Sequence, residues 1–416
     1  MRRTCFASLV LGALAPLVVS CGGEEPPPVA PKPLVAPPPP METAKPEPPP
    51  PAPKPTMAEL QRAAIGDALK GLNGQDPKKF ASVYAEDGVI TVAGLQEVSG
   101  RSEIEQNMKE WFETFKDVKL AFSRVWVKNE TLVLEWVING KHHGELFGVK
   151  GTEQPIGHYG LSVVTMNPEG KVASEHRYGE LGAVMTQVGG AGAKAKPRPI
   201  PEVPSGPPAT ITSSSPDEEK NVEVGKSVLA SLEAGKKDAE FLGLLADDVE
   251  QDGLFHLEMS KGKDGAKKFW KSFTTAFPDA KFETSKALGI GEYAVIESVL
   301  KATHKGPLGT IAPTKKPIAI HVVDIFKIKD GKVARAWTYQ NSLELQQQLG
   351  LFNVQVANLP ASQAPAAPPA KPAAPAPAPA SKPAAPAPAK PPAAGGGGKD
   401  TGGGGGKDTG GGGGKW

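Results

Sequence analysis

An internal repeat limits the folds that this chain can adopt. Landmark residues of a first copy recur in the same order 161 or 162 residues later: Gly74 and Gly235, Phe80 and Phe241, Asp87 and Asp248, Gly100 and Gly262, Phe115 and Phe277, His142 and His304, Pro155 and Pro317, Gly170 and Gly331, Gly189 and Gly350. A register held through so many landmarks indicates a tandem duplication. We therefore expect two copies of one domain.

Residues 304–350 show most clearly what a copy contains. The segment 317–328 is rich in β-branched residues, 329–332 is a tight reversal, and 333–339 alternates again, so two paired strands are predicted. A short helix is predicted over 343–349, and Gly350 is placed to end it.

The first copy begins with helices. Apolar residues at helical spacing follow Met57, a second short helix is predicted over 77–84, and a third over 102–115. A short strand at 89–92 and longer strands at 119–127, 131–139, 156–166 and 172–178 complete the copy. Helices followed by an antiparallel meander define an α+β domain.

The remaining segments are of low complexity. The chain has 416 residues, and much of its 48 Gly and 44 Pro lies outside the two copies. Such segments cannot bury a core. We therefore predict a Pro-rich tether at 21–56, a first domain at 57–189, a linker at 190–216, a second domain at 217–352, and a disordered Pro/Ala- and Gly-rich tail at 353–416.

The N-terminus has the features of a secretory leader. Arg2 and Arg3 precede a short apolar run, and small residues lead to Cys21. The segment resembles the signal peptide of bacterial lipoproteins. The resemblance implies that residues 1–20 are removed, that lipid on Cys21 anchors the protein to a membrane, and that the protein lies at the cell envelope. Gly22 after the cysteine favours the outer membrane, with the protein facing the periplasm or exposed at the surface.

Charge and residue usage exclude several kinds of partner. The formal net charge is +2, with basic and acidic residues interspersed, so no nucleic-acid partner is expected. Cys5 would leave with the leader and Cys21 would carry lipid, so no disulfide is predicted. The seven His residues show no metal-ligand spacing on one element, so no metal is predicted.

The second copy resembles the SnoaL-type polyketide cyclase and ester cyclase family, within the nuclear-transport-factor-2-like superfamily. The resemblance covers nearly all of 218–352 and rests on several short motifs: Ala246-Asp247-Asp248, Phe277-Pro278-Asp279, His304-Lys305-Gly306, Pro313-Thr314-Lys315, Val323-Asp324-Ile325-Phe326, Asp330-Gly331-Lys332-Val333, Trp337 and Gln348-Leu349-Gly350. The first copy is similar more loosely. The resemblance implies two cone-shaped domains, each a curved antiparallel sheet wrapped around helices, with a pocket at the wide end.

Alternation along the strands suggests which side chains would line each pocket. The set predicted for the concave faces is Ala319, His321, Val323, Ile325, Trp337, Tyr339 and Asn341 in the second copy, and Tyr159, Leu161, Val163, His176, Tyr178 and Glu180 in the first. His142 and His304 are further candidates for the pockets, although the favoured interpretation of each is a strand-end residue that only makes a hydrogen bond. Tyr178 and Tyr339 are consistent with pocket wall or with core.

In cyclases of this family a carboxylate on the last strand and a His on the neighbouring strand act as general acid and base, without a metal or cofactor. The second copy retains the histidine as His321, but Asn341 occupies the carboxylate position, and an amide cannot exchange a proton in this way. The first copy has Glu180 at the carboxylate position and Tyr159 at the histidine position. Each copy therefore keeps one half of the pair.

Three interpretations follow from this split pair. Both copies can be non-catalytic binding cones, the first copy can work with Glu180 and a substitute such as His142 or His176, or the two halves can cooperate across a domain interface. The third is not expected, because cones of this kind keep their cavities apart.

The sequence therefore leads to three functional hypotheses. The first is a lipid-anchored protein that binds small hydrophobic or amphipathic molecules without turnover. The second is a cofactor-independent cyclase or isomerase that uses Glu180 as general acid/base. The third is a structural scaffold in which the two domains pair as an intramolecular pseudo-dimer.

Overall fold

The structure is a computed structural model that describes residues 54–190, 199–252 and 259–352. The expected leader 1–20, lipidation at Cys21, the tether up to residue 53 and the tail 353–416 lie outside the described residues. The described residues from Pro55 onward belong to one compact unit. Among the described residues, no helix is long and apolar enough to cross a membrane.

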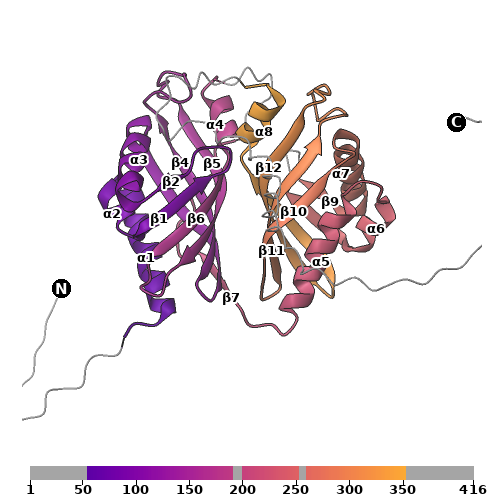
Figure 1. Cartoon of the computed structure of the whole chain (residues 1–416), viewed down its shortest axis with the longest axis horizontal. Helices are drawn as coiled ribbons and strands as arrows, with labels where there is room; N and C mark the ends of the chain where they lie inside the picture. The colour runs from indigo at the N-terminus through magenta and orange to yellow at the C-terminus, as the bar shows by residue number, and fades with distance from the viewer. Residues whose placement is uncertain (1–53, 191–198, 253–258, 353–416) are drawn as a thin grey trace, which may run out of the picture. The chain divides into compact units, whose positions relative to one another are not determined.

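The first domain consists of helices placed against one curved sheet (Figure 1). Its elements are α1 (Met57–Asn73), α2 (Pro77–Ala81), β1 (Tyr84–Val92), β2 (Val98–Ser99), α3 (Arg101–Thr114), β3 (Phe115–Lys128), β4 (Thr131–His142), β5 (Pro155–Met166), β6 (Val172–Gly179), α4 (Leu181–Gln187) and β7 (Ala209–Thr212). The strand order is β2-β1-β6-β5-β4-β3-β7.

The first domain differs from the expectation at three points. Helix α2 ends at Ala81, and Tyr84 already belongs to β1, so the helix predicted over 77–84 is too long. Strand β1 pairs in parallel with β6, so the sheet is not a purely antiparallel meander. Strand β7 comes from the expected linker and pairs in parallel with β3.

The second domain repeats this plan. Its elements are α5 (Glu218–Ser231), α6 (Asp238–Gly243), β8 (Leu245–Asp252), β9 (Ser260–Lys261), α7 (Gly262–Ala276), β10 (Lys281–Ile290), β11 (Tyr293–Thr303), β12 (Pro317–Lys329), β13 (Lys332–Gln340) and α8 (Ser342–Leu349). The strand order is β10-β11-β12-β13-β8-β9. The α+β fold class is therefore confirmed for both copies.

Local sequence explains several boundaries. Helix α1 begins at a capping box, in which Thr56 accepts a hydrogen bond from the Glu59 amide and the Glu59 carboxylate accepts one from the Thr56 amide. Helix α8 ends at Gly350, whose φ of 71° lies in the left-handed region that glycine adopts without strain. The hairpin between β12 and β13 turns at Asp330 and Gly331, both with positive φ.

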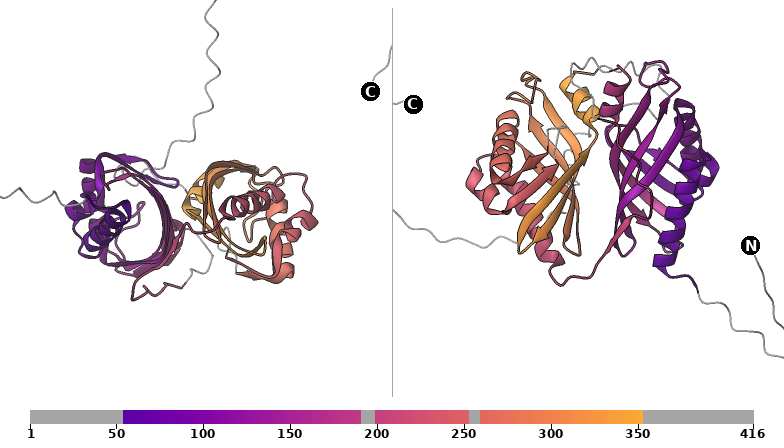
Figure 2. Two further views of the ribbon diagram at one scale, coloured as in Figure 1. Left: turned by 90° about the horizontal axis from the view of Figure 1, so that it is seen from below. Right: turned by 180° about the vertical axis from the view of Figure 1, so that it is seen from behind.

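The concave face of each sheet encloses the hydrophobic core of its domain. Figure 2 shows each sheet curling about its helices. In the first domain Leu134, Val164 and Met166 project from the sheet into a core completed by helices α1 to α3. In the second domain Ile296 and Phe326 occupy the same face.

The opposite, convex faces of the two sheets are also apolar, and they pack against each other. Strand β13 contacts β5 and β6, and α4 contacts α8. A separate buried cluster joins the domains and consists of Ala93, Trp126, Val133, Leu161, Val163, Tyr178, Ile290, Tyr293, Val295, Val323, Ile325 and Trp337.

The prediction of which side chains line the concave faces is therefore wrong. Leu161, Val163, Tyr178, Val323 and Trp337 lie in the cluster between the domains. The physical reason is that both faces of each central strand are buried, so that alternation of apolar and polar residues does not mark the inner face.

Candidate ligand-binding site

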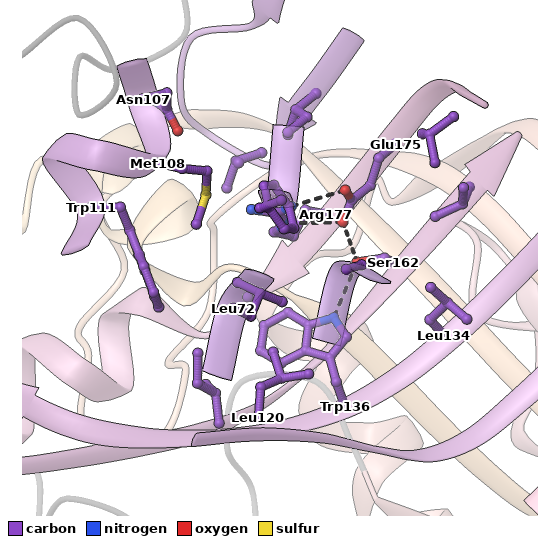
Figure 3. Close-up of a pocket in the computed structure, with 18 of the residues that line it drawn as sticks. Leu72, Asn107, Met108, Trp111, Leu120, Leu134, Trp136, Ser162, Glu175 and Arg177 are labelled. Carbon is purple, nitrogen blue, oxygen red and sulfur yellow. Dashed lines mark hydrogen bonds and ion pairs between the residues drawn. The ribbon is translucent and has the colours of Figure 1, made fainter. Parts of the chain in front are cut away.

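The first domain contains a cavity inside its cone. The cavity has a volume of about 170 Å³ and lies between the concave face of the sheet and helices α1 and α3. Most of its wall is aliphatic and aromatic, with contributions from Leu72, Met108, Trp111, Leu120, Leu134 and Trp136 (Figure 3). A pocket with this lining suits an apolar ligand.

One part of the wall is polar. In Figure 3, Ser162, Glu175 and Arg177 lie together on the sheet, while Asn107, Met108 and Trp111 of α3 lie across the cavity from them. Strand pairing explains the cluster, because Ser162 on β5 faces Arg177 on β6, and Glu175 is two residues before Arg177 on the same face.

Four hydrogen bonds converge on the buried Glu175 carboxylate. Arg177 donates through Nε to Oε1 and through Nη2 to Oε2, each at 2.9 Å. Ser162 donates to Oε1 at 2.6 Å, and the Tyr84 hydroxyl donates to Oε2. The Trp136 indole extends this network by donating to Ser162 Oγ at 3.1 Å.

The network fixes the charge of its members. Burial favours the neutral form of Glu175, but attraction to Arg177 and the donated hydrogen bonds more than offset it, so the pKa of Glu175 lies below its usual value. Burial and the Glu175 charge raise the pKa of the Tyr84 phenol well above its usual value. The wall of the cavity therefore contains an ion pair between Glu175 and Arg177, next to the neutral phenol of Tyr84.

Two glycines make room for Trp136 in the wall. Gly160 on β5 pairs with Gly179 on β6, and the indole lies over both. A Cβ added at Gly160 would lie 2.1 Å from the Trp136 ring, so no larger residue fits there without displacing the indole.

The second cone differs from the first at positions that line the first cavity. The repeat places Phe326 of the second domain at the position of Val164, and Phe326 is buried among Phe273, Phe277 and other core side chains. The polar cluster is not repeated either, because Ala336 and Thr338 take the positions of Glu175 and Arg177.

A second cavity, of about 280 Å³, lies at the other face of β5 and β6 and involves both domains. Five residues of the predicted pocket set contribute to it: Tyr159, Tyr178, Glu180, Trp337 and Tyr339. The sequence thus selected residues that do gather around one cavity, but on the convex side. His158 lines both cavities.

Glu180 and His321, the two halves of the predicted catalytic pair, have different partners. Glu180 is partly buried, and its Oε1 accepts hydrogen bonds from the Ser342 amide, at 3.0 Å, and from the Ser342 hydroxyl. The Glu180 amide donates to His158 Nδ1 at 3.1 Å. His321 Nδ1 lies 2.8 Å from Glu344 Oε1, and this hydrogen bond raises the pKa of His321.

His142 and His304 hold equivalent positions in the two copies. Nδ1 of each lies 3.1 Å from a threonine hydroxyl, Thr152 for His142 and Thr314 for His304. Both rings are fully buried, and burial lowers the pKa of each below its usual value. Neither residue lines the two cavities described above, so this geometry agrees with a strand-end role.

Of the remaining predicted residues, those other than Tyr159 form contacts between the domains. The Tyr178 hydroxyl donates to Glu297 Oε1 at 2.6 Å, and His176 Nδ1 lies 2.6 Å from the same oxygen. In the reverse direction, the Tyr339 hydroxyl donates to Glu135.

Two further predicted residues also contact the first domain. The Trp337 ring lies 3.9 Å from the Arg124 guanidinium, and Asn341 Nδ2 donates to the Ala93 carbonyl at 2.8 Å. Tyr159 is 51% exposed.

Sequence reasoning missed the residues that line the cavity inside the first cone. The signal for Glu175 and Arg177 was their spacing of two on a strand, which places a carboxylate and a guanidinium on one face. The alternation predicts that this face is the outer one. No sequence signal connected Tyr84 to them, because β1 and β6 are far apart in the chain and pair in parallel.

No candidate metal site is found among the described residues, where no three His, Cys, Asp or Glu side chains come close enough together to hold an ion. The wall of the first cavity offers a ligand its apolar residues and the polar side chains Gln96, Asn107, His158 and Arg177.

Comparison with known families gives two matches within the chain. The model of the SnoaL-like polyketide cyclase family matches residues 63–188 and 227–349. None of the curated proteins compared with the chain matches it.

Solved structures similar to the chain align with about one domain of it. AclR from Streptomyces galilaeus is 20% identical and covers 32% of this chain and 98% of its own, with a TM-score of 0.29. A candidate polyketide cyclase from Bacillus cereus is 23% identical and covers 32% and 83%, with a TM-score of 0.28. An epoxide hydrolase of M. tuberculosis is 11% identical and covers 32% and 90%, with a TM-score of 0.27.

Proposed function

The chain belongs to the SnoaL-like polyketide cyclase family, and from this premise we propose that its first domain binds a small hydrophobic or amphipathic molecule without turnover. The apolar cavity of about 170 Å³ supports binding. The Glu175 carboxylate already accepts hydrogen bonds at both oxygens, and this supports the absence of turnover. Its oxygens accept four hydrogen bonds and its pKa is lowered, so it has little capacity to take a proton from a ligand.

The purified protein offers a direct test of binding. Native mass spectrometry would show a co-purified small molecule, and a thermal-shift survey of small apolar compounds would show stabilisation on binding. A protein that carries no such molecule and is stabilised by no apolar compound would contradict the proposal.

A second candidate function is a cofactor-independent isomerase or cyclase that uses Glu180 as general acid/base. It is supported by the position of Glu180 on the wall of the second cavity, beside His158, which lines both cavities and accepts a hydrogen bond from the Glu180 amide. Exchange of acidic protons of a bound ketone with deuterated water, followed by NMR, tests this function. Unchanged exchange in a Glu180→Gln variant would exclude Glu180 as the base.

A third proposal concerns the relation of the two copies, which we propose form an intramolecular pseudo-dimer. Equivalent hydrogen bonds in opposite directions, Tyr178 to Glu297 and Tyr339 to Glu135, support it. The pairing can serve binding as well as a scaffold role, so it does not compete with the first proposal.

We also propose that lipid on Cys21 anchors the protein at the bacterial cell envelope, facing the periplasm or exposed at the surface. The leader-like residues before Cys21 support this. Mass spectrometry of the N-terminal peptide tests it, since a mature protein that begins at an unmodified residue would contradict anchoring. A Cys21→Ala variant should be released from membranes.

A further inference from the structure

The Asp, Glu, Lys and Arg side chains on the wall of the first cavity offer a ligand no net charge, and the wall also includes His158. Among the described residues, the Asp, Glu, Lys and Arg side chains that line the cavity are Glu175 and Arg177 alone, and these two form an ion pair. A charged ligand would therefore enter an apolar cavity without a counter-charge, which is unfavourable. The charge balance favours a neutral ligand.

The polar wall can donate hydrogen bonds but has little capacity to accept them. The four hydrogen bonds to Glu175 use its lone pairs, and Ser162 Oγ already accepts from Trp136 and donates to Glu175. Arg177 has five N–H groups, and its two hydrogen bonds to Glu175 use Nε and Nη2. The N–H groups of Nη1 take no part in that ion pair and can donate to a ligand.

Three further polar side chains line the cavity, Gln96, Asn107 and His158. Asn107 on α3 lines the cavity across from Glu175 and Arg177 (Figure 3), and its amide forms no hydrogen bond within the described part of the chain. An amide offers both a donor and an acceptor. The apolar surfaces of Trp111, Leu120 and Trp136 occupy the space around these polar groups.

We propose that the ligand of the first cavity is a neutral ring-sized molecule with a carbonyl-type acceptor, which accepts a hydrogen bond from Arg177 Nη1 while its ring packs against the apolar wall. This inference rests on the proposed binding function and names the class of ligand. The size follows from the volume of about 170 Å³, since an apolar cavity of about 150 Å³ accommodates benzene. A carbonyl replaces the water that Nη1 would otherwise bind, and no charge is left unpaired.

Three one-ring compounds of similar size differ in charge and in whether they carry a hydrogen-bond acceptor. Acetophenone is neutral and has a carbonyl, ethylbenzene has no acceptor, and benzoate is an anion. Their affinities for the full chain would be measured by isothermal titration calorimetry at pH 7. We expect acetophenone to bind at least tenfold more tightly than benzoate. Tighter binding of benzoate would overturn the inference and leave the proposed binding function in place.

A paired variant tests the role of Arg177. Glu175→Gln with Arg177→Met removes both charges, so that neither is left buried without its partner. The ratio of acetophenone to ethylbenzene affinity should fall about tenfold, which is the loss of one charge-assisted hydrogen bond. An unchanged ratio in the folded variant would overturn the inference.

The chain supplies a matched control on the outer face of the same sheet. Arg124 and Glu135 form a similar ion pair outside the cavity, and Arg124→Met with Glu135→Gln should leave the ratio of acetophenone to ethylbenzene affinity unchanged.

If the Arg177 variant does not fold, the comparison of acetophenone with benzoate on the natural protein still decides the inference. If none of the three compounds binds the natural protein, the proposed binding function itself fails.

Discussion

Asp324 is buried on the inner face of the second sheet at a position equivalent to Ser162. Its Oδ1 accepts a hydrogen bond from Thr338 at 2.5 Å, while Oδ2 has no hydrogen-bond partner among the described residues. Burial raises the pKa of this carboxyl to about 7. The second cone therefore contains a carboxyl group that is costly to ionise.

The raised pKa of Asp324 predicts how stability depends on pH. In the unfolded chain an Asp loses its proton near pH 4, whereas in the fold Asp324 keeps it until about pH 7. Between these values the folded state binds more protons, so stability falls as pH rises and stays low above pH 7. The contribution is about 4 kcal/mol for a difference of about three pKa units.

An Asp324→Asn variant should remove this dependence. The amide oxygen can still accept from Thr338, and no charge forms at high pH. We expect the free energy of unfolding at pH 8, measured with urea, to exceed that of the natural protein by about 2–4 kcal/mol, with little difference near pH 4. Asp279→Asn is the control with opposite sign, because the pKa of Asp279 is lowered to about 2 by hydrogen bonds from Lys305 and Thr303 that outweigh its desolvation. An Asp324→Asn protein no more stable than the natural one at pH 8 would contradict this prediction.

At the scale of elements, β5 and β12 carry side chains of different size at one position of the inner face. Both strands hold the same place in their sheets, between the strand that precedes them and the last long strand. Val164 on β5 lines the first cavity, and Phe326 at the equivalent position on β12 is part of the second core. At this position phenylalanine fills more of the space inside the cone than valine does.

Substituting these two residues one at a time tests what each contributes to binding and to stability. In Val164→Phe the ring would occupy the cavity, so we expect the affinity for acetophenone to fall at least tenfold while the free energy of unfolding changes by no more than about 1–2 kcal/mol. Phe326→Val should leave binding unchanged and cost about 2–3 kcal/mol, because it creates a void in a packed core. Calorimetry and urea unfolding measure both effects. Undiminished binding in a folded Val164→Phe protein would place the ligand elsewhere.

At the scale of the whole molecule, carboxylates buried between the domains accept hydrogen bonds from the opposite domain. Glu297 of the second domain accepts from Tyr178 and His176 of the first, and Glu135 of the first accepts from Tyr339 of the second. Burial favours the neutral form of Glu297, but the hydrogen bonds from His176 and Tyr178 lower its pKa below the usual value. The packing of the domains thus stabilises these charges.

A double-mutant cycle between the domains measures that stabilisation. Tyr178→Phe and Glu297→Gln should each destabilise the protein, and the coupling energy between them should be about 1–3 kcal/mol, as for a buried hydrogen bond to a charged group. The exposed pair Asp67 and Lys70 is the control and should give a coupling below about 0.5 kcal/mol. A coupling near zero for Tyr178 and Glu297 would mean that the two domains do not contact each other through these residues in solution.

The sequence by itself determined the repeat, the α+β class and several boundaries, because these depend on residues close together in the chain or on a constant spacing. Gly350 ends a helix and Asp330-Gly331 makes a turn through local backbone preferences that need no tertiary contact. The spacing of two between Glu175 and Arg177 likewise placed them on one face of a strand.

Only the tertiary structure decided which face is the inner one. The outer faces of both sheets are buried between the domains, so Leu161 and Val323 are as apolar as residues on the inner face, and alternation carries no information about the direction of the core. Pairing across the chain then brought Tyr84 to Glu175, and it placed Glu180 and His321 with partners outside the cone. Contacts between distant segments depend on packing, and that is why the residues around the first cavity could not be read from the chain alone.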